Sequence, residues 1–312
     1  MSSKNLLLKA LDMNIGFIGA GNLAAHMAKG FIKSGAVRAS QITASSPETK
    51  KETVKELKEM GVKFSPDNKV TIKNSEVIML AVKPKLIPYV LEEVASNITS
   101  DQLVFSFAAG VTIASIEKKL PSNMKVMRGM TNTCLAVKEA ATVYAAGTNV
   151  TDEDTARMED LFRRVGLVEE VEEAHVNAVT GLGGSGPAYA YEAIEALADG
   201  SVKMGLPRGL AMRLGAQTLI GAGRMLLETK KHPGELKDAI CSPEGATIYA
   251  LHLLERGGFR SLLMDAVEAS CIRTKDLEAV GDEAYTDNEE IKKRIREGLH
   301  LRDLIDNSVG NK

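Results

Sequence analysis

The first half of the chain alternates short apolar runs with segments that repeat apolar residues at helical spacing. A continuous β-branched and apolar run is typical of a parallel strand covered on both faces. Segments with apolar residues three or four positions apart predict helices that pack on those faces. The runs predict strands at 15–18, 42–44, 62–64, 77–82, 103–107, 125–130, 142–146 and 167–171. The helical segments between them are 23–34, 48–60, 86–95, 112–120 and 151–165.

The pattern changes after Val171, where alanine, leucine and glycine replace the β-branched runs. We therefore predict an α/β protein, with a Rossmann-type doubly wound sheet over 13–172 and an all-α domain for substrate binding and oligomerisation over 173–312. Several of the later helices carry apolar and small residues on more than one face, which favours a subunit interface and a homo-oligomer. These helices are predicted at 174–181, 187–204, 207–229, 233–240, 245–256, 258–280 and 288–300.

A strand, a tight turn and a helix follow one another directly in the segment 14–35, NIGFIGAGNLAAHMAKGFIKSG. Gly19 and Gly21 permit backbone angles and a close approach that side chains would block, and Ala24 takes the place of the third glycine in G-x-G-x-x-G/A. Such a corner aims backbone N–H groups and the positive end of a helix dipole at a pyrophosphate. A purely structural corner also needs small residues. The position near the N-terminus and a second strand about 20 residues on favour a dinucleotide site.

The second predicted strand ends in serines, where sheets that select NAD carry an acid for the adenosine ribose. Ser45 and Ser46 would not repel a 2′-phosphate, so NADP is allowed rather than demanded. Arg38, Lys50 and Lys51 lie nearby in the sequence, although a lysine pair on a helix is more often a solvated face than a phosphate clamp.

Two further strand ends face the predicted ligand crevice, which lies at the carboxyl ends of parallel strands. The segment 81–84, AVKP, completes the apolar run VIMLAV and ends its strand at a proline. We expect this segment to lie along the cofactor, with a plain surface lysine as the alternative for Lys83. The segment 108–110, AAG, forms another corner of small residues after the next strand.

Two glycine-rich stretches in the helical half have the features of binding sites. In the segment 179–191, VTGLGGSGPAYAY, four glycines are expected to break one helix before a proline starts the next. In the segment 242–249, SPEGATIY, proline and glycine precede a helix whose first turn contains Ala246 and Thr247. A helix start of this kind can hold a carboxylate. The alternative for each stretch is an ordinary helix corner, capped by Ser242 in the second case.

Composition and charge exclude several classes of function. The 312 residues are 44% hydrophobic and 26% charged with a net charge of −2, which is typical of a soluble globular protein with two domains. This balance offers no basic footprint for nucleic acid or an anionic membrane, and no apolar run approaches the roughly 20 residues of a transmembrane helix. The three cysteines lie far apart, which fits a reducing compartment, and the five histidines form no metal-binding pair, so we expect no metal site. The first residues, MSSKNLLLKALD, are short for a secretory signal and poor in arginine for a mitochondrial transit peptide.

Seven stretches together carry a resemblance to a known family. They are GFIGAGNLA near the start, AVKP at 81–84, AAGVTIASIEKKL at 108–120, MTNT at 130–133, VTGLGGSGPAY at 179–189, SPEGATI at 242–248 and GGFRSLLMDAVEASCIRTK at 257–275. With these stretches the chain resembles the pyrroline-5-carboxylate reductase family along essentially its whole length. The resemblance implies reduction of 1-pyrroline-5-carboxylate to L-proline with NADPH or NADH, the last step of proline biosynthesis. It also implies a second domain like the C-terminal domain of 6-phosphogluconate dehydrogenase, dimers that join into larger rings such as a decamer, and a cytoplasmic location, with a mitochondrial one as the alternative.

The resemblance also implies roles for individual residues. Thr247 would hydrogen-bond the ring nitrogen of the substrate and Glu173 would contact the substrate, so these two are the candidate catalytic residues. The substrate carboxylate would meet Ser242 and the backbone N–H groups of Gly245, Ala246 and Thr247. The cofactor-binding residues would be Gly19, Ala20, Gly21, Asn22 and Leu23 at the pyrophosphate, Ser46 and Asn68 on the adenosine side, and Ala81, Val82, Lys83, Pro84, Phe107, Ala108 and Ala109 beside the rest of the cofactor.

The chain departs from the family pattern at four places. MTNTC, GGSGPA and SPEG stand where the family usually has MPNTP, SGSGPA and SPGG, and Ala239 replaces a cofactor-contacting asparagine. Glu244 therefore makes the expected carboxylate site more acidic. Two alternatives stay open: a β-hydroxyacid dehydrogenase or imine reductase of the same architecture, or a nucleotide-binding protein without catalysis. The first usually needs a lysine or aspartate on the helix at 174–181, which has neither, and the second would not need SPEGATI.

Overall fold

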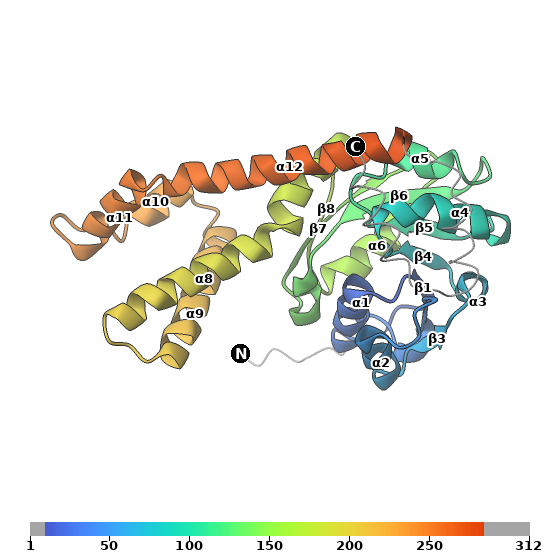
Figure 1. Ribbon diagram of the computed structural model, residues 1–312, viewed down its shortest axis with the longest axis horizontal. Helices are drawn as coiled ribbons and strands as arrows, with labels where there is room; N and C mark the ends of the chain where they lie inside the picture. Colours follow the sequence, from blue (N-terminus) through green and yellow to red (C-terminus); the bar gives the residue numbers. More distant parts are fainter. Residues whose placement is uncertain (1–9, 284–312) are drawn as a thin grey trace, which may run out of the picture. The chain divides into compact units, whose positions relative to one another are not determined.

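The N-terminal part of the chain forms one eight-stranded sheet (Figure 1). The structure, a computed structural model, describes residues 10–283. Every strand that the hydrophobic pattern predicts is present. The strands are β1 (Ile15–Ile18), β2 (Ile42–Ser45), β3 (Lys63–Ser65), β4 (Val77–Leu80), β5 (Leu103–Ser106), β6 (Lys125–Met130), β7 (Ala140–Ala146) and β8 (Gly166–Glu170).

The strand order β3-β2-β1-β4-β5-β6-β7-β8 reverses between β1 and β4, and only the pair β6 and β7 is antiparallel. The register pairs Ile18 with both Ser45 and Leu80, and Leu80 with Ser106. Since these are the last residues of β1, β2, β4 and β5, the carboxyl ends of four strands are level at one edge of the sheet. A doubly wound sheet binds its ligand at this edge, beside the point where the strand order reverses. The predicted Rossmann-type sheet is therefore confirmed.

Helices cover both faces of the sheet (Figure 1). Alternate strand residues belong to two separate buried clusters, with Met79 and Phe105 in one and Ile78 and Val104 in the other. Burial on both faces explains why the strands form continuous apolar runs in the sequence. The helices and turns of this part are α1 (Asn22–Lys33), η1 (Ala39–Gln41), α2 (Glu52–Glu59), α3 (Asn68–Lys73), η2 (Pro84–Leu86), α4 (Ile87–Val94), η3 (Ala95–Asn97), α5 (Ile113–Glu117), η4 (Thr133–Val137) and α6 (Asp152–Arg163).

Two helical segments differ from the prediction. The pattern did not predict α3, because its six residues, NKVTIK, are too short to show a helical repeat. The single helix predicted at 174–181 is instead the 3-10 turn η5 (Glu173–His175), the α-helix α7 (Val176–Val179) and the π-helix η6 (Thr180–Gly184). The glycines expected to break a helix thus widen it into a π turn. The helix predicted at 288–300 lies outside the described residues.

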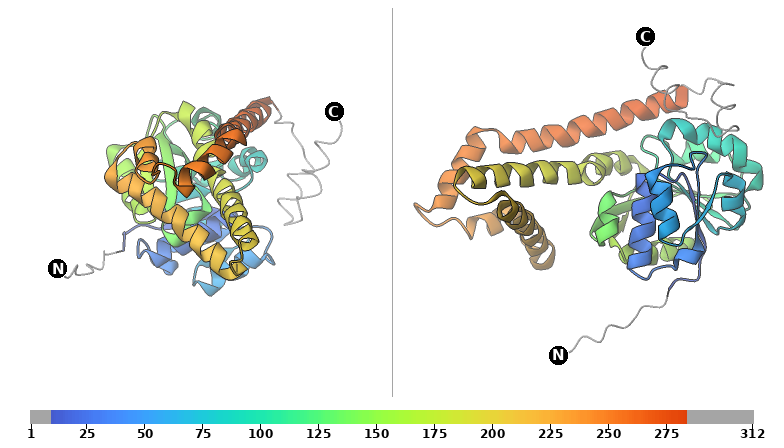
Figure 2. Two further views of the ribbon diagram at one scale, coloured as in Figure 1. Left: turned by 90° about the vertical axis from the view of Figure 1, so that its left-hand side faces the viewer. Right: turned by 60° about the horizontal axis from the view of Figure 1, so that its bottom comes forward.

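The residues Ser185–Ser270 form a second compact unit, here called the helical unit, and the other described residues form the sheet unit. Within the helical unit α8 and α9 pack against each other (Figure 2). Only Ala198 and Ala211 of this unit have buried side chains. Among the described helices, none combines the length and the apolar character that crossing a membrane requires. The remaining helices are α8 (Gly186–Lys203), α9 (Arg208–Thr229), α10 (Pro233–Asp238), α11 (Ala246–Arg256) and α12 (Phe259–Glu283), which starts in the helical unit.

Candidate active site

The glycine corner between β1 and α1 has the backbone that close approach of a ligand needs. Gly19 has a φ of +104°, and a Cβ on it would lie 2.6 Å from the carbonyl oxygen of Ala81. Glycine is therefore required here by both conformation and space. A Cβ on Gly21 would meet no heavy atom within 4 Å, so the space in front of this residue is open.

The first turn of α1 presents backbone N–H groups to that open space. Gly21 is the N-cap residue and no side chain caps the helix. The hydroxyl of Thr53 donates a hydrogen bond of 2.6 Å to the carbonyl oxygen of Ala20, which fixes the corner from behind. The N–H groups at the start of a helix have no partner within the helix and favour an anion. The corner therefore fits the pyrophosphate of a dinucleotide.

Ser46 and Asn68 lie next to the ends of β2 and β3 and are both buried. The hydroxyl of Ser45 donates to Asn68 Oδ1 at 2.8 Å, and Asn68 Nδ2 donates to a carboxylate oxygen of Glu93 at 3.0 Å. Burial raises the pKa of the Glu93 carboxyl, although the bond from Asn68 opposes that shift. Asn68 is thus held in one orientation by partners on both sides.

The lysines considered for a 2′-phosphate are not equivalent. Lys51 forms an ion pair of 2.9 Å with Glu48, whose backbone N–H donates to the hydroxyl of Ser46 at 3.2 Å. The charge of Lys51 is therefore already balanced by a neighbouring carboxylate. Lys50 is exposed. That NADP is allowed rather than demanded stays a prediction.

The segments after β4 and β5 reach the same edge of the sheet. The N–H of Ala81 donates to the carbonyl of Ile18 at 2.9 Å, and the N–H of Phe107 donates to the carbonyl of Leu80 at 3.3 Å. The structure therefore brings 81–84 beside the glycine corner, and 107–109 beside the end of β4. The corner after β5 turns at Gly110, whose φ is +72°.

Glu173 lies in η5 and its carboxylate is engaged within the sheet unit. Its Oε1 accepts hydrogen bonds from the backbone N–H of Ile113 at 2.7 Å and from Nη1 of Arg128 at 3.1 Å. Arg128 is only 2% exposed, and its Nη2 donates to Oδ1 of Asn177 at 2.7 Å. Sequence reasoning missed Arg128 and Asn177. The available signal was an arginine inside the otherwise apolar strand KVMRGM, where a buried cation needs a partner.

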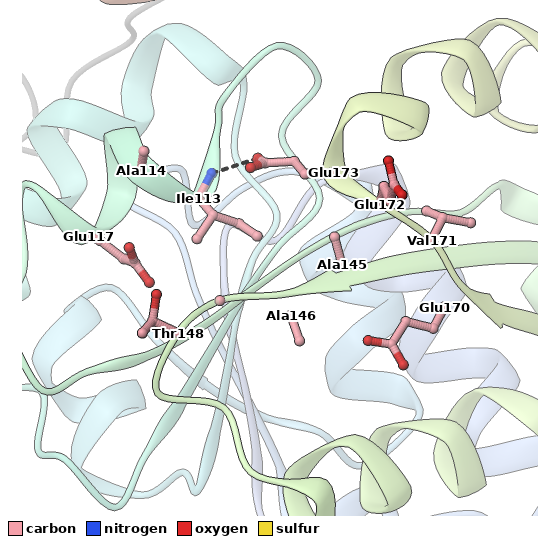
Figure 3. A pocket seen from close by; sticks show the side chains of 11 residues that line it. Ile113, Ala114, Glu117, Ala145, Ala146, Thr148, Glu170, Val171, Glu172 and Glu173 are labelled. Atoms are coloured by element: carbon pink, nitrogen blue, oxygen red, sulfur yellow. Dashed lines mark hydrogen bonds between the residues drawn. The ribbon is translucent and has the colours of Figure 1, made fainter.

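Glu173 also borders an open cleft of about 810 Å³ (Figure 3). Four carboxylates, those of Glu117, Glu170, Glu172 and Glu173, line this cleft. Like charges at this density disfavour an anionic ligand. Among the described residues no group of three or more His, Cys, Asp or Glu side chains could hold a metal ion. The cleft is therefore a poor candidate for the dinucleotide or for a carboxylate substrate.

In the helical unit, α11 starts at the sequence SPEGATI. Gly245 is its N-cap and no side chain caps the helix, so the N–H groups of the first turn, those of Ala246 and Thr247, have no helical partner. The N–H of Gly245 already donates to the carbonyl of Ser242 at 3.1 Å. Glu244 has a φ of +59°, in the left-handed region that favours glycine. The start of α11 thus presents backbone N–H groups without a helical partner, and the exposed Glu244 lies beside them.

The glycine-rich stretch after α7 is tied to the end of β6. Asn132 Nδ2 donates to the carbonyl of Gly183 at 2.9 Å, and Asn132 Oδ1 accepts from the N–H of Cys134 at 3.0 Å. The hydroxyl of Thr180 donates to the carbonyl of Val176 at 2.9 Å. Side chains therefore hold the π turn at both ends. The bond from Asn132 joins segments that are distant in the chain, and the sequence did not reveal it.

Comparison with protein families gives two matches. Residues 173–277 match the family described as pyrroline-5-carboxylate reductase dimerisation, and residues 14–110 match that described as NADP oxidoreductase coenzyme F420-dependent. The match to the oxidoreductase family thus lies in the sheet-forming part of the chain, and the match to the dimerisation family covers the helical part that follows it.

Individual relatives cover both parts. The chain is 53% identical to pyrroline-5-carboxylate reductase 2 of Bos taurus over 292 residues, which are 93% of this chain and 91% of the relative. The solved structure of Plasmodium falciparum pyrroline carboxylate reductase with NADP bound is similar, with a TM-score of 0.78 and 30% identity over 86% of this chain and 99% of that one. A pyrroline-5-carboxylate reductase from Coxiella burnetii has a TM-score of 0.75 and 35% identity with the same coverage.

Proposed function

The chain belongs to the pyrroline-5-carboxylate reductase family, and on that premise we propose how its own residues reduce 1-pyrroline-5-carboxylate to L-proline with NAD(P)H. The observation that carries the function is the 53% identity over 93% of the chain, because so long a match must include both the sheet-forming and the helical parts. We assign dinucleotide binding to 13–172, and substrate binding and dimerisation to 173–312.

The dinucleotide is held at the carboxyl edge of the sheet. The open space at Gly21 and the uncapped start of α1 support a pyrophosphate there. The remaining residues follow from their places at the ends of neighbouring strands. The proposed contacts are Gly19, Ala20, Gly21, Asn22 and Leu23 for the pyrophosphate, Ser46 and Asn68 for the adenosine side, and Ala81, Val82, Lys83, Pro84, Phe107, Ala108 and Ala109 for the rest.

The substrate carboxylate is held at the start of α11. The N–H groups of Ala246 and Thr247 supply the donors, and Ser242 lies at the turn before them. Gly245 is proposed as a weaker donor because it shares its N–H with the carbonyl of Ser242. The hydroxyl of Thr247, in the first turn, is proposed to hydrogen-bond the ring nitrogen.

The chemistry asks little of the protein beyond position. When bound, the reduced nicotinamide supplies a hydride to the C=N carbon. A C=N carbon beside a protonated nitrogen is already electrophilic, so the residues of the chain need only orient the ring, fix its carboxylate and exclude water. Thr247 orients the nitrogen and keeps its proton hydrogen-bonded. No strong acid is required for this reaction.

We propose that the protein is a homodimer through its helical unit and that dimers join into a larger ring, a decamer. Support comes from the exposed apolar side chains of this unit, which include Leu227 and Tyr249, each 69% exposed. A monomer rarely exposes so much apolar surface without a partner. For the compartment we propose the cytoplasm, with the mitochondrion as the alternative, because three free cysteines fit a reducing environment.

The test is a spectrophotometric assay that follows oxidation of NADPH and of NADH separately with 1-pyrroline-5-carboxylate as substrate. We expect L-proline as the product, identified by chromatography. The control substrate is a carbonyl acid of the kind that a β-hydroxyacid dehydrogenase reduces to a β-hydroxyacid. We expect no reduction of this compound. Absence of turnover with both cofactors, in a folded and oligomeric protein, would refute the proposed activity.

A further inference from the structure

Glu173 and the buried Arg128 link η5, β6 and the start of α5. We infer that Glu173 is a positioning residue, which acts on the reaction by fixing the β5–α5 corner, defined as residues 107–112. The inference rests on the proposed function, because that corner includes the proposed cofactor contacts at 107–109. It replaces the expectation that the Glu173 carboxylate touches the substrate.

The first step is the bond at the start of α5. Ile113 is the first residue of α5, and its N–H donates to Glu173 Oε1 at 2.7 Å (Figure 3). The N–H two positions further along, that of Ser115, is capped by the Thr112 hydroxyl at 3.1 Å. The corner thus ends in a helix start that is held by a local cap and by a carboxylate 60 residues away in the chain.

The second step is the anchor of Glu173 itself. Arg128 Nη1 donates to Glu173 Oε1 at 3.1 Å, and Arg128 Nη2 donates to Asn177 Oδ1 at 2.7 Å. Arg128 pairs in register with Ser106, the last residue of β5, so its backbone lies level with the point where the corner begins. Arg128 is thus connected to both ends of the corner, by strand pairing at Ser106 and through Glu173 at Ile113.

The third step is what surrounds the carboxylate. The Glu173 side chain is 32% exposed, and the cleft that it faces is also lined by Glu117, Glu170 and Glu172. A substrate carboxylate would meet like charges there. The Oε1 atom already accepts two hydrogen bonds. The geometry therefore favours a role through the corner over direct contact with the substrate.

Five variants separate the two roles. Glu173→Gln keeps an oxygen acceptor for both donors and removes the charge, whereas Glu173→Ala removes the acceptor. Ile113→Pro deletes the N–H donor and should keep the helix start, because proline suits the first position of a helix and Thr112 before it is extended, with a ψ of 158°. Ile113→Ala is its matched control, since it removes the side chain and keeps the N–H. Glu172→Gln controls for loss of charge in the same cleft.

We expect Glu173→Ala and Ile113→Pro to weaken NADPH binding, measured by nicotinamide fluorescence without substrate, by about tenfold and to lower kcat by a similar factor. The KM for 1-pyrroline-5-carboxylate at saturating NADPH should stay within about threefold of the wild type. Glu173→Gln should restore binding and kcat to within about threefold. Ile113→Ala and Glu172→Gln should resemble the wild type in NADPH binding. Melting temperatures of the five variants check that each is folded.

A raised KM for 1-pyrroline-5-carboxylate in Glu173→Gln, with unchanged NADPH binding, would overturn the inference and make Glu173 a substrate contact. Unchanged NADPH binding in both Glu173→Ala and Ile113→Pro would overturn it as well. NADPH binding, which tests the role of Glu173, is measured separately from substrate reduction, which tests the proposed function. If the wild type binds NADPH but does not reduce the substrate, the activity fails while the binding series still decides the role of Glu173.

Discussion

The sheet unit buries two clusters of large apolar side chains, whereas the helical unit buries only the side chains of Ala198 and Ala211. The first can be stabilised by its own core. The second leaves long helices with apolar residues facing outward, so its stability depends on surfaces that it does not cover itself. The sheet unit can thus be specified by the chain alone, whereas the helical unit, in the proposed dimer, is specified by the chain together with a second copy.

The largest expected difference comes from the same Phe→Ala change in each unit. Phe105 is fully buried, and its ring stacks on Phe107 at 4.5 Å and meets Phe162 at 5.6 Å, whereas Phe259 is 42% exposed. Phe105→Ala should lower the free energy of unfolding by about 3–5 kcal/mol, at any protein concentration. Phe259→Ala should cost less than about 1 kcal/mol in dilute protein, and more once the protein assembles. Urea unfolding at two protein concentrations measures both. If both variants lost the same free energy of unfolding at both protein concentrations, the two units would not differ in the way proposed.

A charge placed on each unit's exposed apolar surface tests the partner more directly. Leu227 on α9 is 69% exposed and Leu167 on β8 is 54% exposed. Leu227→Glu should weaken self-association by about 2–4 kcal/mol, because a carboxylate would be buried in the proposed dimer interface. Leu167→Glu carries the same charge and should leave the oligomer unchanged. Light scattering after size-exclusion chromatography gives the mass. An unchanged mass for Leu227→Glu would mean that α9 does not face the partner at this residue.

We also expect the helical unit to contribute to the reaction through Thr247. Variants of this residue test that role by steady-state kinetics rather than by stability. Thr247→Val keeps the shape and removes the hydroxyl that we propose to bond the ring nitrogen. It should lower kcat/KM by roughly tenfold to a hundredfold, equivalent to about 1.5–3 kcal/mol, with cofactor binding spared. Thr247→Ser should keep much of the activity. If the valine variant has full kcat/KM and a lower melting temperature, Thr247 only packs the start of α11.

The same difference between the units explains how far the sequence could be interpreted. Strands such as VIML are predicted because burial on both faces leaves an apolar run that needs no knowledge of its neighbours. The glycine corner is predicted because backbone conformation dictates the residue type at Gly19. The link between Arg128 and Glu173 was not predictable, since it joins residues 45 positions apart and depends on which strands lie side by side. For the same reason the π turn at Thr180–Gly184, tied down by Asn132, was expected to be a break.

The smallest expected effect sharpens the picture of the sheet unit as a self-sufficient fold. Asp154 closes a capping box with Thr151 at the start of α6 and pairs with Lys125 at 2.9 Å. Burial of this side chain would raise its pKa, but the hydrogen bonds from Thr151 and Lys125 together hold the pKa below the ordinary 3.8. A carboxyl with a depressed pKa stabilises the fold above its unfolded-state pKa, and this contribution is lost as the pH falls through the folded-state value.

Asp154→Asn should therefore cost about 1 kcal/mol of unfolding free energy at about pH 6, and the cost should shrink as the pH falls below about 3.8. Asp152, exposed in the same first turn, is the matched control, and Asp152→Asn should cost only a few tenths of a kcal/mol, about the value of a helix-dipole contact. Urea unfolding of the three proteins across this pH range provides the measurement. Because the contacts of Asp154 lie within the sheet unit, the oligomer mass should be the same in all three. A difference between Asp154→Asn and the wild type that grows on acidification would show that the carboxylate opposes the fold rather than stabilising it.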